Sequence, residues 1–146
     1  MTDWLDEYLD NIGMTETLRA RVREAYDFFS TACPENITGA FVTDFVTDEG
    51  LREYESLWLF SDSYAMEAKR FVSEDHFDMA VLKSNVVRWV VKIQDYDFQH
   101  AGDKSRMHLE VNFQQHVSGS LRASRENCDY LRALFLDRIV PNLVKL

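Results

Sequence analysis

Apolar side chains in the first 34 residues recur at the three- and four-residue spacing of amphipathic helices. One stripe consists of Trp4, Leu5, Tyr8, Leu9 and Ile12, and a second consists of Leu18, Val22, Ala25 and Phe29. Gly13 is suited to end the first helix, and Thr15 to cap the second. The second helix must end near Pro34, because the residue before a proline is displaced from the helical region. We therefore predict two helices within residues 1–34.

Beyond Ile37 the apolar period changes from that of a helix to the two-residue period of β-strands. Turn-forming segments divide this region into about seven predicted strands, over residues 41–46, 52–60, 64–71, 77–82, 86–98, 107–113 and 118–123. The alternation is most regular in residues 107–113. Its apolar members are Met107, Leu109, Val111 and Phe113. One face of this strand must therefore belong to the core and the other to solvent or a partner.

The longest β-like run, residues 86–98, changes phase along its length. Its first part places Val87, Trp89, Val91 and Ile93 on one face, whereas Tyr96 and Phe98 fall in the opposite phase. We predict a bulge or a sharp bend near Gln94-Asp95. Trp89 in this run, like Trp58 in residues 52–60, has apolar neighbours, and we expect both rings to anchor the core.

A final amphipathic helix is predicted over residues 124–140. Its apolar face comprises Cys128, Leu131, Phe135 and Ile139. Ser124 is suited to cap this helix, and Pro141 kinks or ends it. The chain thus reads as one α+β domain spanning residues 1–146. It has a helical segment (residues 1–34), followed by a strand-rich part with a closing helix (residues 38–146).

About seven strands followed by one amphipathic helix resembles the pleckstrin-homology-like barrel. The resemblance is carried by the predicted strands 41–60, 64–71, 86–98, 107–113 and 118–123, and by the helix 124–140. It implies a bent, partly open antiparallel barrel of about seven strands whose end is covered by the C-terminal helix. An alternative is the NTF2-like cone, which also begins with helices and continues into a curved sheet, although such proteins usually end on a strand.

The same resemblance bears on ligands. Lipid-binding members of this class carry lysine and arginine around the first hairpin loop, whereas here residues 47–53 read Thr-Asp-Glu-Gly-Leu-Arg-Glu, which is acidic. Phosphoinositide binding is therefore not expected. Many domains with this barrel are protein-interaction modules, and the resemblance implies a protein partner here.

Charge is distributed unevenly along the chain. Residues 1–62 carry 14 acidic and four basic side chains, whereas residues 63–146 carry 11 acidic and 12 basic ones. The net charge of the whole chain is −9. The acidic first half argues against nonspecific binding to nucleic acid or anionic lipid. It forms either a solvated face or a docking surface for a basic partner.

The chain contains no apolar run long enough to span a membrane, and the acidic N-terminus does not resemble an export signal. Cys33 and Cys128 match no metal or redox spacing, so we expect free thiols and a cytoplasmic location.

No motif for catalysis, a cofactor or a metal is present. The histidines His76, His100, His108 and His116 form no close pair, and the acidic cluster around His76 lacks a second nitrogen or sulfur ligand for zinc. We predict no catalytic residue, no cofactor and no metal site.

One polar triplet keeps a chemical alternative open. Arg106, His108 and Glu110 project from the same strand face, two residues apart. In a concave pocket they could orient an anionic ligand or move a proton, whereas on an open sheet they are an ordinary exposed stripe.

The leading hypothesis is a non-catalytic protein-interaction or scaffold module. Its partner surface is predicted on the acidic half or on the N-terminal helices. The candidate residues are Asp44, Asp48, Glu49, Glu53 and Glu55, together with Trp4 and Tyr8. The alternatives are a small-ligand-binding protein or enzyme with an NTF2-like pocket, and self-association through a sheet edge.

Overall fold

The computed structural model describes residues 2–33, 35–72, 78–95, 101–113 and 117–143. Within these residues the helices and strands follow the predicted order. The helices are α1 (Asp3–Asn11), α2 (Glu16–Ala32) and α3 (Asn127–Leu134). The strands are β1 (Gly39–Val46), β2 (Arg52–Phe60), β3 (Tyr64–Lys69), β4 (Asp78–Lys83), β5 (Val86–Gln94), β6 (Arg106–Phe113) and β7 (Val117–Ser124). A short π-helical turn, Phe135–Ile139, extends α3.

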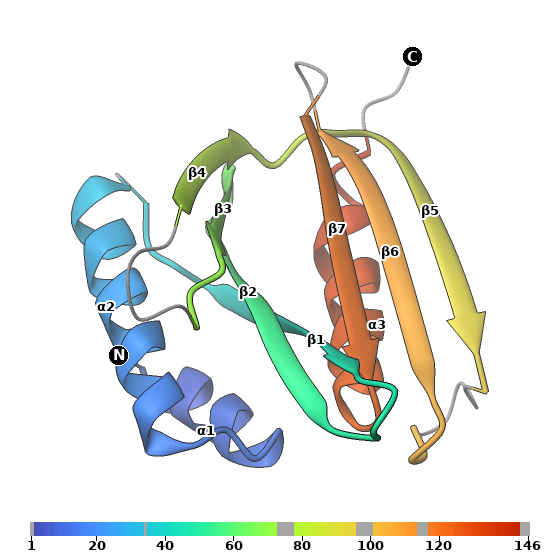
Figure 1. The fold of residues 1–146 in the computed structure, drawn as a ribbon. Helices are drawn as coiled ribbons and strands as arrows, with labels where there is room; N and C mark the ends of the chain where they lie inside the picture. The colour runs from blue at the N-terminus through green and yellow to red at the C-terminus, as the bar shows by residue number, and fades with distance from the viewer. Residues whose placement is uncertain (1, 34, 73–77, 96–100, 114–116, 144–146) are drawn as a thin grey trace.

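The strands form two antiparallel sheets. One has the order β1-β2-β3-β4 and the other the order β5-β6-β7 (Figure 1). β1 contacts β7, so the two sheets meet along these strands. The predicted α+β class is confirmed, with two N-terminal helices, seven strands in the described residues and a C-terminal helix. The described strands do not close into a barrel.

Helices flank both sheets. In Figure 1, α1 and α2 lie beside the four-stranded sheet, and α3 lies behind the three-stranded one. The buried apolar side chains of α1, α2 and α3 belong to one cluster with those of both sheets. Burial along β6 alternates as predicted: Met107, Leu109, Val111 and Phe113 are buried. A single core therefore joins the helical segment to the strands.

Three predicted element boundaries were wrong. β3 ends at Lys69, because Arg70 adopts a left-handed backbone with φ of 56°. β5 ends at Gln94, and the predicted bend lies at Asp95, with φ of 50°; Tyr96 and Phe98 are outside the described residues. Ser124 does not cap α3. It is the last residue of β7, and its hydroxyl instead donates a hydrogen bond to Asp44.

The two central tryptophans have different environments. Trp58 is fully buried and stacks on Phe113, so its predicted core role is confirmed. The prediction for Trp89 was wrong, because 36% of this residue is exposed. The physical reason is its place on an edge strand: α3 contacts β6 and β7 across the sheet, whereas the ring of Trp89 lies edge-on to Phe135 in the extension of α3, with 4.6 Å between the ring centroids.

Both cysteines are free thiols in the structure. Cys33 lies at the C-terminal end of α2, and Cys128 is buried on the inner face of α3, as predicted. None of the helices in the described part of the chain is long and apolar enough to cross a membrane.

Candidate functional site

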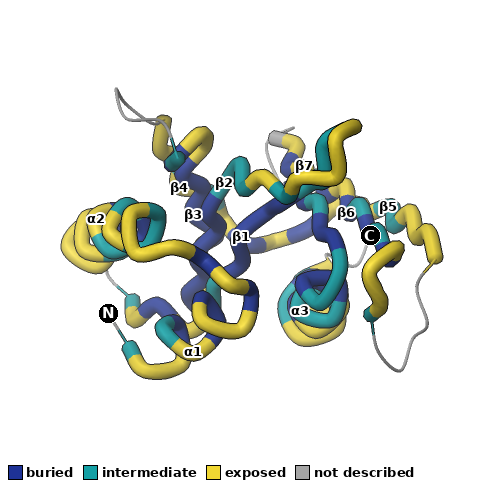
Figure 2. The backbone as a smooth tube through the Cα atoms, turned by 60° about the horizontal axis from the view of Figure 1, so that its bottom comes forward, coloured by how far each residue is buried: buried dark blue, intermediate teal, exposed yellow. Residues whose placement is uncertain are grey.

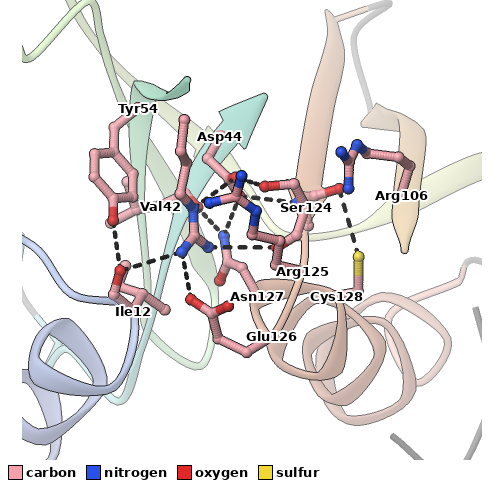
Figure 3. Close-up of polar contacts among 12 residues, drawn as sticks. Ile12, Val42, Asp44, Tyr54, Arg106, Ser124, Arg125, Glu126, Asn127 and Cys128 are labelled. Atoms are coloured by element: carbon pink, nitrogen blue, oxygen red, sulfur yellow. Dashed lines mark hydrogen bonds and ion pairs between the residues drawn. The ribbon is translucent and has the colours of Figure 1, made fainter. Parts of the chain in front are cut away.

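Asp44 on β1 lies at the centre of a buried polar network that links four segments (Figure 3). Its carboxylate accepts hydrogen bonds from the backbone N–H of Ser124 at 3.1 Å and from the side-chain amide of Asn127 at 2.7 Å. It also accepts one from the Nε of Arg52 at 2.9 Å. Asp44 thereby joins β1 to β2, to the end of β7 and to the start of α3.

Arg52 extends this network to the helical segment. Its guanidinium donates to the backbone carbonyl of Ile12 at 3.2 Å and pairs with Glu126. Burial alone lowers the pKa of Arg52, but Asp44 and Glu126 outweigh that effect and raise it. The hydroxyl of Tyr54 donates to the same carbonyl of Ile12 at 2.6 Å. The network thus holds the end of α1 against β2.

Tyr8 completes the link from α1. Its hydroxyl donates to Asn127 at 2.8 Å and accepts from the backbone N–H of Val42 at 2.9 Å. Burial raises the pKa of Tyr8 well above its ordinary value. Asp44 and Tyr8 were expected on a partner surface, and that prediction was wrong. Both side chains lie in the interior because they satisfy polar groups where three elements meet.

The other acidic candidates lie elsewhere. Asp48, Glu49 and Glu53 are exposed on and beside the β1–β2 turn. Glu55 is half-buried and forms a bidentate ion pair with Arg122 of β7, at 2.8 and 3.0 Å. Trp4 is partly exposed on α1. A smaller acidic surface therefore remains at the β1–β2 turn.

The predicted polar triplet lies on the outer face of β6. Nε2 of His108 is 2.7 Å from the hydroxyl of Ser120 and 3.9 Å from Glu110. Arg106 instead donates to the backbone carbonyls of Asp103 and Ser105. In a serine–histidine–acid relay the acid binds the second ring nitrogen. Here Ser120 and Glu110 approach the same nitrogen, so the three side chains do not form that relay.

Two open hollows flank His108. The first, about 350 Å³, extends over β5 and β6 to the tip of β1, and its polar lining includes Lys92, Arg106 and Arg122. The second, about 470 Å³, lies toward β2 and β3, with Glu55 and Glu67 in its lining. Arg122, stacked over the ring of Phe45 at 4.6 Å, lines the first hollow together with that ring. His108 thus lies on an open sheet face with shallow depressions on either side.

Other chemical candidates give no site. His76, His100 and His116 are outside the described residues. Among the residues that are described, no group of three histidine, cysteine or acidic side chains could hold a metal ion.

Strand β5 is a candidate site that the sequence did not predict. β5 pairs with β6 on one edge. On the other edge, the described residues provide only one bridge, from Val86 to Leu143, with the N–H of Val86 donating to the carbonyl of Asn142 at 2.8 Å. The rest of this edge, residues 87–94, is without a strand partner in the described chain. Figure 2 shows β5 largely in the colours of intermediate and exposed residues.

The inner face of β5 is apolar and incompletely covered. Trp89, Val91 and Ile93 lie opposite Val111, Leu109 and Met107 of β6, and so share the face that packs on the core. We call these three residues of β5 the apolar strip. Trp89 and Ile93 nevertheless remain 36% and 41% exposed.

The outer face of β5 is basic. Arg88 and Lys92 are exposed there, and neither forms a hydrogen bond or an ion pair with any described residue. Lys92 lies opposite His108 of β6, which lies opposite Arg122 of β7. We call Lys92, His108 and Arg122 the cross-strand row. Alternation of Arg88 and Lys92 with Trp89, Val91 and Ile93 is visible in the sequence, but the exposure of this strand is not.

Comparison of the chain with protein-family models, with curated proteins and with solved structures gave no match. The candidate site accordingly rests on geometry. It consists of the edge of β5 that pairs with no other described strand, with its apolar strip on one face and its basic side chains on the other.

Proposed function

We propose that this protein is a protein-interaction module that binds an extended segment of a partner along the outer edge of β5. The observation that carries the proposal is the edge over residues 87–94, which pairs with no strand of the described residues and is bordered by exposed side chains of the apolar strip. An edge strand offers a row of N–H and C=O groups to another chain, and adding a strand to such an edge is a recurring mode of peptide recognition.

The neighbouring segment supports this mode. After α3, the side chains of Leu136, Val140 and Leu143 are exposed, and Leu143 pairs with Val86 at the start of β5. A strand added to β5 would cover Trp89 and Ile93. The pleckstrin-homology-like resemblance, which rests on the predicted order of strands and closing helix, also favours an interaction module, because many domains of that class bind proteins.

A selection experiment tests the proposal. Peptides of nine residues, the length of β5, are selected from a random library on the intact protein and mapped by amide chemical-shift changes. We expect the shifts to concentrate in β5. The double variant Trp89→Thr, Ile93→Thr should bind the selected peptides about thirtyfold more weakly, because each of the two lost apolar contacts contributes on the order of 1 kcal/mol.

The matched control is the other edge strand. Met79 and Val81 are exposed apolar residues of β4, and the variant Met79→Thr, Val81→Thr should bind the peptides as the wild type does. An equal loss of peptide affinity in both variants would overturn strand addition at β5, as would chemical-shift changes confined to other elements.

The acidic β1–β2 turn is the second candidate surface. It is favoured by Leu51, which is 64% exposed beside Asp48, Glu49 and Glu53. Shift changes centred on this turn would assign the interaction to it instead, and charge reversal of those three acids would then abolish binding.

A further inference from the structure

The two faces of β5 differ in chemistry, and a strand added to its edge would meet both of them. Residues directly opposite each other on neighbouring strands have their side chains on the same face. Every second residue of an added segment would therefore lie beside Trp89, Val91 or Ile93, and the residues between them beside Arg88, Val90, Lys92 or Gln94.

From this juxtaposition we infer that the segment bound by β5 alternates apolar residues with acidic ones. The inference rests on the proposed function and specifies its partner. Apolar side chains would cover the apolar strip, and carboxylates would pair across strands with Arg88 and Lys92. Opposite charges on directly facing residues stabilise a strand pair, whereas like charges destabilise it.

The rest of the sheet strengthens the preference for acids. On β7, Arg122 is already neutralised by its bidentate pair with Glu55. At the other end of the cross-strand row, Lys92 has no ion pair among the described residues. An acidic residue opposite Lys92 would extend the row by one strand and supply the missing counter-charge.

A second copy of this chain is a poorer occupant. Antiparallel pairing of two β5 strands that matches their apolar strips would also place the outer faces on one side of the joined sheet. Arg88 and Lys92 of both copies would then share that side, and the outer-face residues of β5 include no acid. Like-charge repulsion disfavours that arrangement.

The net charge of the protein makes the inference easy to separate from simple electrostatic attraction. At −9, the whole molecule attracts cationic peptides. The local charge on β5 favours acidic ones instead. Three labelled peptides of nine residues provide the probes, with valine alternating with glutamate, with glutamine or with lysine.

Fluorescence anisotropy with the full-length protein measures the dissociation constants. We expect the valine–glutamate peptide to bind about tenfold more tightly than the valine–glutamine peptide, and the valine–lysine peptide to bind most weakly. At about 1 M salt, where charges are screened beyond ~3 Å, the dissociation constants of the valine–glutamate and valine–glutamine peptides should converge. In the variant Arg88→Glu, Lys92→Glu the order of the glutamate and lysine peptides should reverse.

The control variant Lys83→Glu, Lys104→Glu makes the same change in net charge at exposed positions that are not part of β5, and it should retain the wild-type order. Equal affinity for all three peptides, with shifts at β5, would overturn the acidic preference and leave strand addition standing. Failure of every peptide to shift the β5 amides would overturn both. If the valine–lysine peptide binds most tightly, net charge alone governs association and the acidic preference is overturned. If the amide chemical shifts of β5 change with protein concentration in the absence of peptide, a second copy of the chain is the occupant.

Discussion

The carboxylate of Asp44 on β1 accepts a hydrogen bond from the side-chain amide of Asn127 at the start of α3, at 2.7 Å. The same amide donates to the carbonyl of Val42, so Asn127 ties the closing helix to two positions of β1. These residues are 83 positions apart in the chain. Their contact fixes where α3 begins against the meeting point of the two sheets.

Replacement of Asp44 should therefore be costly. In Asp44→Ala, Arg52 keeps a side chain that is only 12% exposed but loses its buried counter-charge. Removing one partner of a buried ion pair costs about 3–5 kcal/mol. We expect a loss of that size in the free energy of unfolding, measured by urea denaturation. Asp48→Ala, at an exposed acid of the adjoining turn, should change it by less than about 0.5 kcal/mol. Similar values for the two variants would contradict a structural role of the network.

Gly119 on β7 provides a test of core packing. A Cβ at this position would lie 2.8 Å from Cη2 of Trp58 and 3.1 Å from Cε2 of Phe113. Gly119→Ala should destabilise the protein by about 1–3 kcal/mol, because these stacked rings must shift. In Gly102→Ala the new methyl group meets no atom within 4 Å, so this control should unfold at nearly the wild-type temperature in a thermal scan. An unchanged melting temperature for Gly119→Ala would show that the rings have room to move.

Glu67 on β3 should make stability depend on pH. Burial raises its pKa, with a further contribution from Glu55, while Lys69 and Ser56 act in the opposite direction. The folded protein thus holds this proton more tightly than the unfolded chain, so stability falls as pH rises from the unfolded pKa through the raised folded one. Glu67→Gln should therefore raise the melting temperature at pH 7 and have a smaller effect below about pH 4. A stability gain that is the same at both pH values would contradict this origin.

The two thiols should differ in reactivity. Burial, aided by Asp44, raises the pKa of Cys128 to about 12, whereas Cys33 is partly exposed at the end of α2. Because the thiolate is the nucleophile, Cys128 should react with a thiol reagent only after unfolding. In the native protein the Cys33→Ser variant should show no rapid labelling, and Cys128→Ser should label as the wild type does. Rapid labelling of Cys33→Ser would mean that the α3 interface opens readily.

The acidic candidates show how far residue type alone could lead. Asp44 and Asp48 are four residues apart in a segment that the sequence marks as acidic, yet one is buried and the other exposed. The run Phe41-Val42-Thr43-Asp44-Phe45-Val46 does contain a signal, since an acid within an apolar strand needs partners if it is buried. Those partners, Arg52, Ser124 and Asn127, come from three other segments, and the local pattern does not reveal which segments meet.

β5 illustrates the same division. Its alternation of apolar and basic residues is a property of the sequence, because side chains of a strand point to opposite faces. Its place at the edge of a sheet depends on the strand order β5-β6-β7, and the exposure of Trp89 and Ile93 follows because α3 packs across β6 and β7.

The sequence by itself determined the α+β class, the order of the helices and strands, and the inner face of β6, since these follow from local periodicity. Only the tertiary structure decided that the strands form two sheets, that Tyr8 and Asp44 are interior, and that one edge of β5 lacks a strand partner among the described residues. Such features arise from contacts between residues distant in the chain, and those contacts depend on how whole elements pack.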